Sequence, residues 1–284
     1  MFLFLLRLLA LLPLRWLHAL GKTIGLLVYL FPGRYRKRLQ ANAAQAGYSS
    51  AGFARQAAAQ TGAMILETPK VWLQPERCLK KCQMKNVEVV HQALAENKGI
   101  LYLTPHLGCF EITARALVQH GPITVMFKPP RQAFIEPAMR LSRNMPALHA
   151  VPASVRGIRE FLRALKRHEA VGMLPDQVPS TGDGLWVPFF NKPAYTMTLA
   201  AKLALQAQVP VVLTAGERLP KGQGWRIHYV RLITPETPTI ENMVYAINQA
   251  METLIQRFPT QYLWSYNRYK IPPEAPAIPA HLFS

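Results

Sequence analysis

Residues 97–111 read NKGILYLTPHLGCFE, and this stretch decides the fold class. Its apolar run GILYLT at 99–104 has the length and composition of a buried strand. A helical pattern at 86–97 precedes the run, and a second helical pattern follows it at 108–120. A buried strand between two helices is the repeating unit of α/β proteins.

The same alternation continues toward the carboxyl end of the chain. Further strand-like apolar runs occur at 123–128, 148–152, 170–174, 209–215, 225–233 and 262–266. Helical patterns separate most of them, at 132–145, 154–168, 196–208 and 239–257. Strands that alternate with helices predict an α/β fold with a mixed or largely parallel central sheet flanked by helices.

Charge and hydrophobicity restrict the possible partners. Lys and Arg number 33 against 15 Asp and Glu, a formal net charge of +18, while 50% of the residues are hydrophobic. Such hydrophobicity excludes a disordered basic protein. It favours a membrane face or an acidic partner; nucleic acid fits the charge alone, but no RNA-binding signature or helix-turn-helix spacing supports it. The three cysteines form no even disulfide framework, which fits a reducing compartment.

Residues 1–31, MFLFLLRLLALLPLRWLHALGKTIGLLVYLF, are predicted to form a membrane anchor. A spanning helix needs about 20 largely uncharged residues, but Arg7, Arg15 and Lys22 interrupt this run. An interfacial or shallowly inserted helix fits better, although the sequence leaves open whether the segment is a transmembrane helix, and a buried core helix is the alternative. The basic run GRYRKR that follows favours the cytoplasmic face. We therefore expect an anchor at 1–31 and the α/β domain at 32–284.

His106 and Glu111 are the candidate catalytic pair. Five residues apart, they would lie about 140° apart on one straight helix and could not share a proton. If His106 instead lies in the turn and Gly108 opens the helix, Glu111 falls in the first turn and can fold back to the imidazole. Such a pair is a general base at the carboxyl end of a strand, where open α/β sheets bind their ligands. The alternative is a histidine at a helix start beside a solvated glutamate.

Several segments together resemble one protein family. They follow the expected anchor in the order NKGILYLTPHLGCFE, MFKPPR at 126–131, RGIREFLRALKRHEAVGMLPDQ at 156–177, GDGLWVPFFNKPAYT at 182–196 and QYLWSYNRYKIPP at 261–273. In wording, order and spacing the chain resembles the lipid A late acyltransferases, the lauroyl and myristoyl transferase branch of the glycerolipid-acyltransferase-like superfamily. That superfamily more often carries Asp at the second position of the motif, and Glu111 is the form typical of the lipid A branch.

The resemblance implies a reaction. His106 would be the base and Glu111 its partner, and the base would take a proton from a hydroxyl on an acyl chain of a Kdo-bearing lipid A precursor. The resulting alkoxide would attack the thioester of an acyl-acyl carrier protein. No acyl-enzyme, cofactor or metal is implied, so Cys109 is expected to be a small buried residue rather than a nucleophile.

Other residues are expected to support the site. Asp176 and Gln177 occupy the family's L-P-D-Q position after the strand at 170–174, and Arg156 is the leading candidate to hold the Asp176 carboxylate. A turn-forming aspartate is the alternative. Lys128 and Arg131 either bind lipid phosphate or belong to a solvated loop.

The resulting hypothesis is an acyltransferase on the cytoplasmic face of the cell inner membrane, in lipopolysaccharide biosynthesis. Its partners would be acyl carrier protein, the lipid A precursor and membrane lipids, and no nucleic acid. The alternatives are an acyltransferase for another glycolipid or a lysophospholipid, and a non-catalytic basic protein that binds the membrane surface. The sequence specifies neither the acyl chain length nor which hydroxyl is modified.

Overall fold

The computed structural model describes residues 2–127, 136, 139 and 145–283. Its helices and 3-10 turns are α1 (Phe2–Leu11), α2 (Leu14–Leu30), α3 (Arg34–Gln45), α4 (Ala51–Leu73), α5 (Pro75–Leu79), α6 (Glu88–Ala95), α7 (Phe110–Leu117), η1 (Val118–His120), α9 (Val155–Lys166), α10 (Leu199–Ala207), η3 (Pro220–Gly222), α11 (Ile240–Arg257), η4 (Pro259–Gln261) and η5 (Ala280–Phe283). Its strands are β1 (Cys82–Lys85), β2 (Ile100–Leu103), β3 (Ile123–Phe127), β4 (Leu148–Pro152), β5 (Ala170–Met173), β6 (Gly184–Phe189), β7 (Lys192–Met197), β8 (Val211–Arg218) and β9 (Trp225–Arg231).

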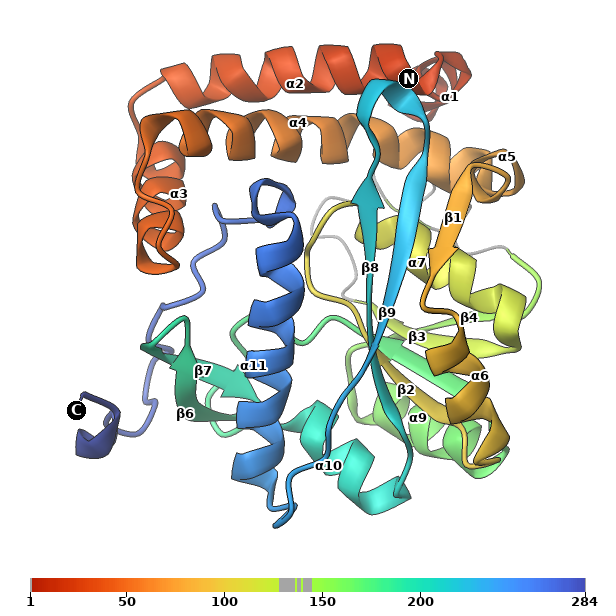
Figure 1. Cartoon of the computed structure of the whole chain (residues 1–284), viewed down its shortest axis with the longest axis vertical. Helices are drawn as coiled ribbons and strands as arrows, with labels where there is room; N and C mark the ends of the chain where they lie inside the picture. Colours follow the sequence, from red (N-terminus) through yellow and green to blue (C-terminus); the bar gives the residue numbers. More distant parts are fainter. Residues whose placement is uncertain (1, 128–135, 137–138, 140–144, 284) are drawn as a thin grey trace.

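A mostly parallel sheet forms the centre of the molecule (Figure 1). Within the described residues its strand order is β1-β9-β8-β2-β5-β3-β4. The strands from β8 to β4 run parallel, whereas β9 pairs antiparallel with β8 and β1 runs parallel to β9. The expected mixed, largely parallel sheet flanked by helices is therefore confirmed. The helix expected at 132–145 falls almost wholly outside the described residues.

The quoted apolar run forms β2, which lies between β8 and β5 near the middle of the sheet. All four of its residues are buried. A parallel strand covered by helices on both faces has no solvent side, so it is apolar throughout rather than alternating. This explains why GILYLT was recognisable from composition alone.

Two expectations at the carboxyl half are corrected. Residues 262–266 were expected to form a strand, but among the described residues Tyr262 makes only an isolated bridge to Leu107. Residues 184–197 instead form an antiparallel hairpin of β6 and β7, which the sequence analysis did not predict. Its turn has positive φ at Phe190 and Asn191, and Phe190 is a bulky residue that rarely marks such a turn.

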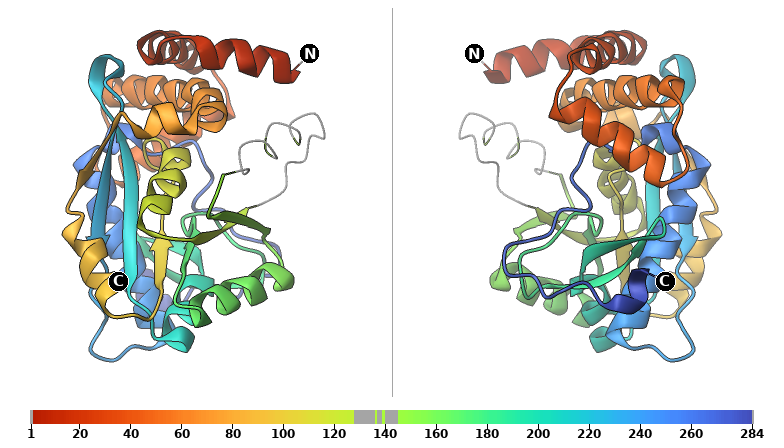
Figure 2. Two further views of the ribbon diagram at one scale, coloured as in Figure 1. Left: turned by 90° about the vertical axis from the view of Figure 1, so that its right-hand side faces the viewer. Right: turned by 90° about the vertical axis from the view of Figure 1, so that its left-hand side faces the viewer.

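The N-terminal helices form a layer over α4 (Figure 2). The inner face of α2 buries Leu17, His18 and Gly21. A Cβ atom built on Gly21 would lie 2.5 Å from the carbonyl oxygen of Gly62, so the two helix backbones approach as closely as glycine allows. Residues 1–31 therefore contribute packing to the α/β domain, as the alternative of a buried core helix anticipated for one face.

The outer face of this layer is apolar and exposed. Exposed side chains on α1 and α2 include Phe4, Leu8, Leu11, Trp16, Leu20, Ile24, Leu27 and Leu30. Within the part of the chain that the structure describes, however, no helix is both long enough and apolar enough to cross a bilayer. The transmembrane helix considered for residues 1–31 is thus not supported.

Candidate active site

His106 lies just beyond the carboxyl end of β2, and Asp176 lies just beyond that of β5. The two strands pair in parallel with Leu103 opposite Met173, so each site residue comes three positions after a paired residue. The ladder continues past the strands, because the backbone N–H of Thr104 donates to the carbonyl of Met173 at 3.0 Å. The register between two neighbouring strands therefore brings the imidazole and the carboxylate together.

The two side chains are held by a double contact. The Nδ1 atom of His106 lies 2.7 Å from Oδ1 of Asp176, and the backbone N–H of His106 donates to Oδ2 at 2.8 Å. On the far side of the ring, Nε2 lies 3.2 Å from the amide nitrogen of Gln177. Both sequence-predicted residues of the L-P-D-Q segment thus contact the histidine.

Electrostatics fix the proton on the inner ring nitrogen. Burial raises the pKa of Asp176, but the charge of His106, its two hydrogen bonds and the charge of Arg268 outweigh burial and leave the pKa below its usual value. An ionised carboxylate only accepts hydrogen bonds, so Nδ1 carries the proton that it donates to Oδ1. In the neutral ring Nε2 then carries no proton, and its lone pair accepts from the amide of Gln177. This is the geometry of a general base.

The turn that carries His106 is clamped from both sides. Gly108 has φ +62°, and a Cβ atom there would lie 2.1 Å from the carbonyl oxygen of Gly216 on β8. On the other side, the Gly108 N–H donates to the Gln261 carbonyl at 2.9 Å, and the Leu263 N–H donates to the His106 carbonyl at 3.0 Å. Only glycine combines this φ with so close an approach, which gives the expected site residue Gly108 a physical role.

Glu111 lies in the first turn of α7, as expected, but the contact with His106 is corrected. Within the described residues its carboxylate accepts from the indole N–H of Trp72 at 2.8 Å and from Arg115 at 3.2 Å. The imidazole is already paired with Asp176, which approaches from the neighbouring strand rather than from the next turn of chain. The Glu111 side chain is 29% exposed, so it remains open to a ligand.

Arg156 does not hold Asp176. It lies exposed in the first turn of α9, and the arginine whose charge acts on Asp176 is Arg268. Arg268 is buried and donates to the Tyr195 carbonyl at 3.0 Å and to the Thr196 hydroxyl at 2.6 Å. The expectation that an arginine stabilises the carboxylate was sound on charge grounds, but Arg268 is 92 positions away in the sequence and gave no local signal.

The remaining candidates are quickly placed. Lys128 and Arg131 lie outside the described residues. Cys109 is buried, and burial raises the pKa of its thiol well above the usual value, so the thiolate needed for nucleophilic attack is disfavoured. Within the described ranges, no cluster of three or more His, Cys, Asp or Glu side chains is arranged to hold a metal ion.

The chain is similar in sequence to known proteins of one family. A sequence family described as "Bacterial lipid A biosynthesis acyltransferase" matches residues 1–271. The chain is 26% identical over 221 residues to a lipid A biosynthesis palmitoleoyltransferase of Escherichia coli (strain K12), covering 75% of this chain and 69% of that protein. It is 25% identical over 219 residues to a lipid A biosynthesis lauroyltransferase of the same strain, covering 75% and 70%. A lipid A biosynthesis acyltransferase of Haemophilus influenzae is 26% identical over 221 residues, covering 75% and 68%.

Proposed function

The chain belongs to the bacterial lipid A biosynthesis acyltransferase family, and from this premise we propose the reaction that its site performs. The protein transfers an acyl chain from an acyl-acyl carrier protein to a hydroxyl on an acyl chain of a Kdo-bearing lipid A precursor. The observation that carries this proposal is the position of His106 at the carboxyl edge of the sheet, with Nδ1 held by Asp176 and Nε2 on the opposite side of the ring beside the Gln177 amide.

In the proposed reaction, Nε2 of His106 takes the proton of the acceptor hydroxyl while the hydroxyl oxygen attacks the thioester carbonyl carbon. The new C–O bond forms, and the C–S bond then breaks. The imidazolium returns its proton to the leaving thiolate, so the enzyme ends the cycle unchanged. Asp176 stabilises the imidazolium between the two proton transfers, which a neutral partner would do less well.

Glu111 has a separate role in this proposal. Its carboxylate is oriented by Trp72 and Arg115 and is partly open to solvent. We assign it to binding the acceptor hydroxyl or its neighbouring polar groups rather than to orienting His106. The indole and guanidinium donors hold the carboxylate in one orientation, as a residue that binds substrate requires.

Charge favours the proposed partners. The net charge of +18 attracts both an acidic carrier protein and the anionic headgroup of the acceptor. Arg156, at the exposed start of α9 beyond β4, is available for such contacts. Lys128 and Arg131 follow the end of β3, and we retain them as candidate phosphate ligands.

The apolar outer face of α1 and α2 supports attachment to the cytoplasmic surface of the inner membrane. Its stripe Trp16, Leu20, Ile24 and Leu27 has helical spacing and is exposed, as in helices that lie in the bilayer interface. The layer rests on α4 (Figure 1), and the indole of Trp72 near the end of α4 donates to Glu111 in the first turn of α7, which follows β2 in the sequence. A membrane-embedded acceptor would therefore be presented on the side of the molecule that holds the site.

The test uses the purified full chain in detergent with a lauroyl- or myristoyl-loaded carrier protein and a Kdo-bearing lipid A precursor. Mass spectrometry should show the acceptor gaining one acyl group with wild type and not with His106→Ala. Lysophospholipid and a second glycolipid serve as competing acceptors. Preferential transfer to either would replace the proposed acceptor, and no transfer with any donor would favour a non-catalytic membrane-binding protein.

A further inference from the structure

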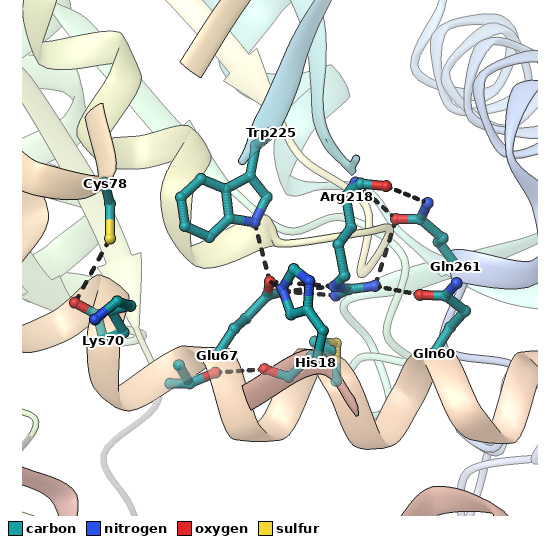
Figure 3. Close-up of polar contacts among 10 residues, drawn as sticks. His18, Gln60, Glu67, Lys70, Cys78, Arg218, Trp225 and Gln261 are labelled. Carbon is teal, nitrogen blue, oxygen red and sulfur yellow. Dashed lines mark hydrogen bonds and ion pairs between the residues drawn. The ribbon is translucent and has the colours of Figure 1, made fainter. Parts of the chain in front are cut away.

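A buried polar chain links the N-terminal layer to the sheet. Its centre is Glu67 on α4, whose carboxylate has no exposed surface. Figure 3 shows His18, Arg218 and Trp225 converging on this carboxylate from three different elements. His18 Nε2 lies 2.8 Å from Oε2, the Trp225 indole donates to the same oxygen at 3.0 Å, and Nε of Arg218 donates to both oxygens at 3.1 Å.

The Glu67 carboxylate at the centre of this polar chain is ionised. Burial alone raises the pKa of Glu67, but the charge of Arg218 and the hydrogen bonds from His18 and Arg218 outweigh it and lower the pKa to about 2. A buried ion pair is rarely a source of stability, because an apolar replacement of similar volume is often as good. Its bonds are directional, however, and they fix how α2, α4 and β8 sit against one another.

The polar chain of hydrogen bonds continues from Arg218 to the turn at residues 106–108, which carries His106. The side chain of Gln261 accepts from the Arg218 backbone N–H at 2.8 Å and donates to the Arg218 carbonyl at 3.1 Å. The backbone of the same segment then holds the turn, because the Gln261 carbonyl accepts from Gly108 and the Leu263 N–H donates to the His106 carbonyl. Each step from α2 to the base is thus a hydrogen bond between described atoms or a short piece of backbone.

We propose that His18, Glu67, Arg218 and Gln261 are positioning residues that set the place of His106, so that α2 is part of the catalytic apparatus as well as of the membrane-facing layer. This inference rests on the proposed function for its kinetic consequence. Its structural consequence, a connection between α2 and the 106–108 turn, stands independently of which reaction the site performs. None of the four residues is expected to touch substrate.

The first test is hydrogen exchange of the full-length protein with mass-spectrometric detection. His18→Leu removes one donor to Glu67 at the far end of the chain. It should speed exchange in a peptide spanning 104–112, in addition to peptides of α2. His18→Gln, which offers an amide N–H at a similar reach, should restore the wild-type exchange of 104–112. Faster exchange confined to α2 and α4 would overturn the proposal.

Tyr29→Phe is the matched control. Tyr29 is also buried on α2, and its hydroxyl accepts one hydrogen bond, from Gln40 at 3.0 Å. This contact joins α2 to α3 rather than to β8. Its loss therefore loosens the same helix and leaves the buried polar chain of hydrogen bonds intact. Tyr29→Phe should leave exchange at 104–112 unchanged. If it speeds exchange of 104–112 as much as His18→Leu does, α2 acts through general packing and the buried polar chain of hydrogen bonds has no special role.

Kinetics supply the second test. Because small displacements of a base cost rate, His18→Leu should lower kcat by about tenfold and Gln261→Leu by up to about 100-fold, each with KM for the loaded carrier protein within about twofold of wild type. Activity is expressed per folded molecule, from the thermal unfolding curve. In the double variant His18→Leu with Gln261→Leu, the loss of kcat should be smaller than the product of the two single losses, because both substitutions interrupt the same polar chain of hydrogen bonds. Multiplying losses would mean that the two residues act independently.

A measurement on the wild-type protein covers the case in which His18→Leu does not fold. In native-state exchange at increasing low denaturant, the amides of 104–112 and those of the inner face of α2 should open with the same free energy, as one cooperative unit. If the turn opens separately from α2, the proposal is wrong. If wild type transfers no acyl group to any acceptor while this coupling is present, only the proposed function fails.

Discussion

Two histidine–carboxylate pairs with nearly equal nitrogen–oxygen distances lie at opposite ends of the same series of hydrogen bonds. His106 and Asp176 meet at 2.7 Å, and His18 and Glu67 meet at 2.8 Å. The His106 side chain is 15% exposed, and its outer nitrogen lies beside the amide of Gln177. The His18 side chain is 6% exposed, and the carboxylate it contacts is also bound by an arginine and a tryptophan.

The difference shows that the contact itself does not make a catalytic dyad. A carboxylate shared with a fully buried guanidinium has little left with which to stabilise an imidazolium, and a sealed ring offers no nitrogen to a substrate. Asp176 accepts from the ring and from the backbone N–H of His106 with its two oxygens, and the charge of Arg268 also lowers its pKa. The first pair is therefore assigned to proton transfer and the second to positioning, and the following predictions test that division.

The largest expected effect is that of His106→Ala. Loss of a general base lowers the rate by about 10²–10⁴, and activity is expressed per folded molecule because the substitution also leaves the buried Asp176 carboxylate without the imidazole. Acyl transfer and thermal unfolding are measured side by side. His168→Ala, at an exposed histidine on the opposite edge of the sheet, is the control and should keep full activity. Wild-type turnover by His106→Ala would remove the base from the mechanism.

Glu67→Gln should show its main effect in stability. It leaves the buried Arg218 without its counter-charge, a change that costs about 3–5 kcal/mol in free energy of unfolding. Urea unfolding of the two proteins at neutral pH measures the difference. A loss below about 1 kcal/mol, the level of a surface ion pair, would show that Glu67 is not the centre of a buried network.

The same carboxylate predicts a pH dependence. The pKa of Glu67 is lowered from 4.5 to about 2 in the folded protein, so its stabilising contribution is complete above about pH 4.5 and is lost as the pH falls toward 2. The shift corresponds to about 3 kcal/mol. Unfolding measured between pH 6 and pH 2 should therefore show a steeper fall for wild type than for Glu67→Gln; parallel curves would contradict the assignment.

Asp176→Asn should lower kcat by about 10³-fold, within the range for lost general-base function. Asparagine has one acceptor oxygen for the two donors of His106, so it no longer fixes the proton on Nδ1, and without a charge it cannot stabilise the imidazolium. Glu67→Gln, corrected for its folded fraction, should lose much less activity. If Glu67→Gln lost more activity than Asp176→Asn, the roles given to the two histidine–carboxylate pairs would have to be exchanged.

Glu111→Gln should reduce activity by about tenfold, as expected when one charge-assisted hydrogen bond to a ligand is weakened. The loss should appear in KM for the lipid acceptor and kcat together and leave KM for the loaded carrier protein unchanged. A loss as large as that of Asp176→Asn, with acceptor KM unchanged, would return Glu111 to the role of partner for His106.

Cys109→Ala should have the smallest effect, within about twofold of wild-type turnover, because buried thiols of raised pKa are inert. The intact mass of the enzyme during turnover provides an independent check. An acyl adduct on wild type that disappears in a folded, inactive Cys109→Ala variant would establish a covalent route.

The fold was more predictable from the sequence than the contacts of the site. GILYLT and the helices around it were predictable because a doubly covered strand is apolar throughout. His106 followed from its place after that strand. Its contact with Asp176 in place of Glu111 was not predictable from spacing within one segment, because it depends on the register between β2 and β5. No local pattern encodes that register.

Other site residues had weaker signals. Glu67 is the first acidic residue in a strongly basic N-terminal quarter of the chain, and its isolation could have marked it as a buried partner of a cation. Gln261 and Arg268 flank the segment 262–266 that was expected to be a strand, and nothing in the sequence around them indicated which groups their side chains contact. The hairpin of β6 and β7 was missed because its turn uses Phe190 and Asn191 rather than a glycine pair.

The most direct test of the central assignment is the tautomer of His106, read from ¹⁵N-labelled histidine by NMR in the full-length protein at a pH where the ring is neutral. A His106→Gln sample identifies the signal. We expect the proton on Nδ1 and a free Nε2 in wild type and in Glu111→Gln, and loss of this preference in Asp176→Asn. A proton on Nε2 in wild type, or a preference lost in Glu111→Gln but kept in Asp176→Asn, would contradict the account.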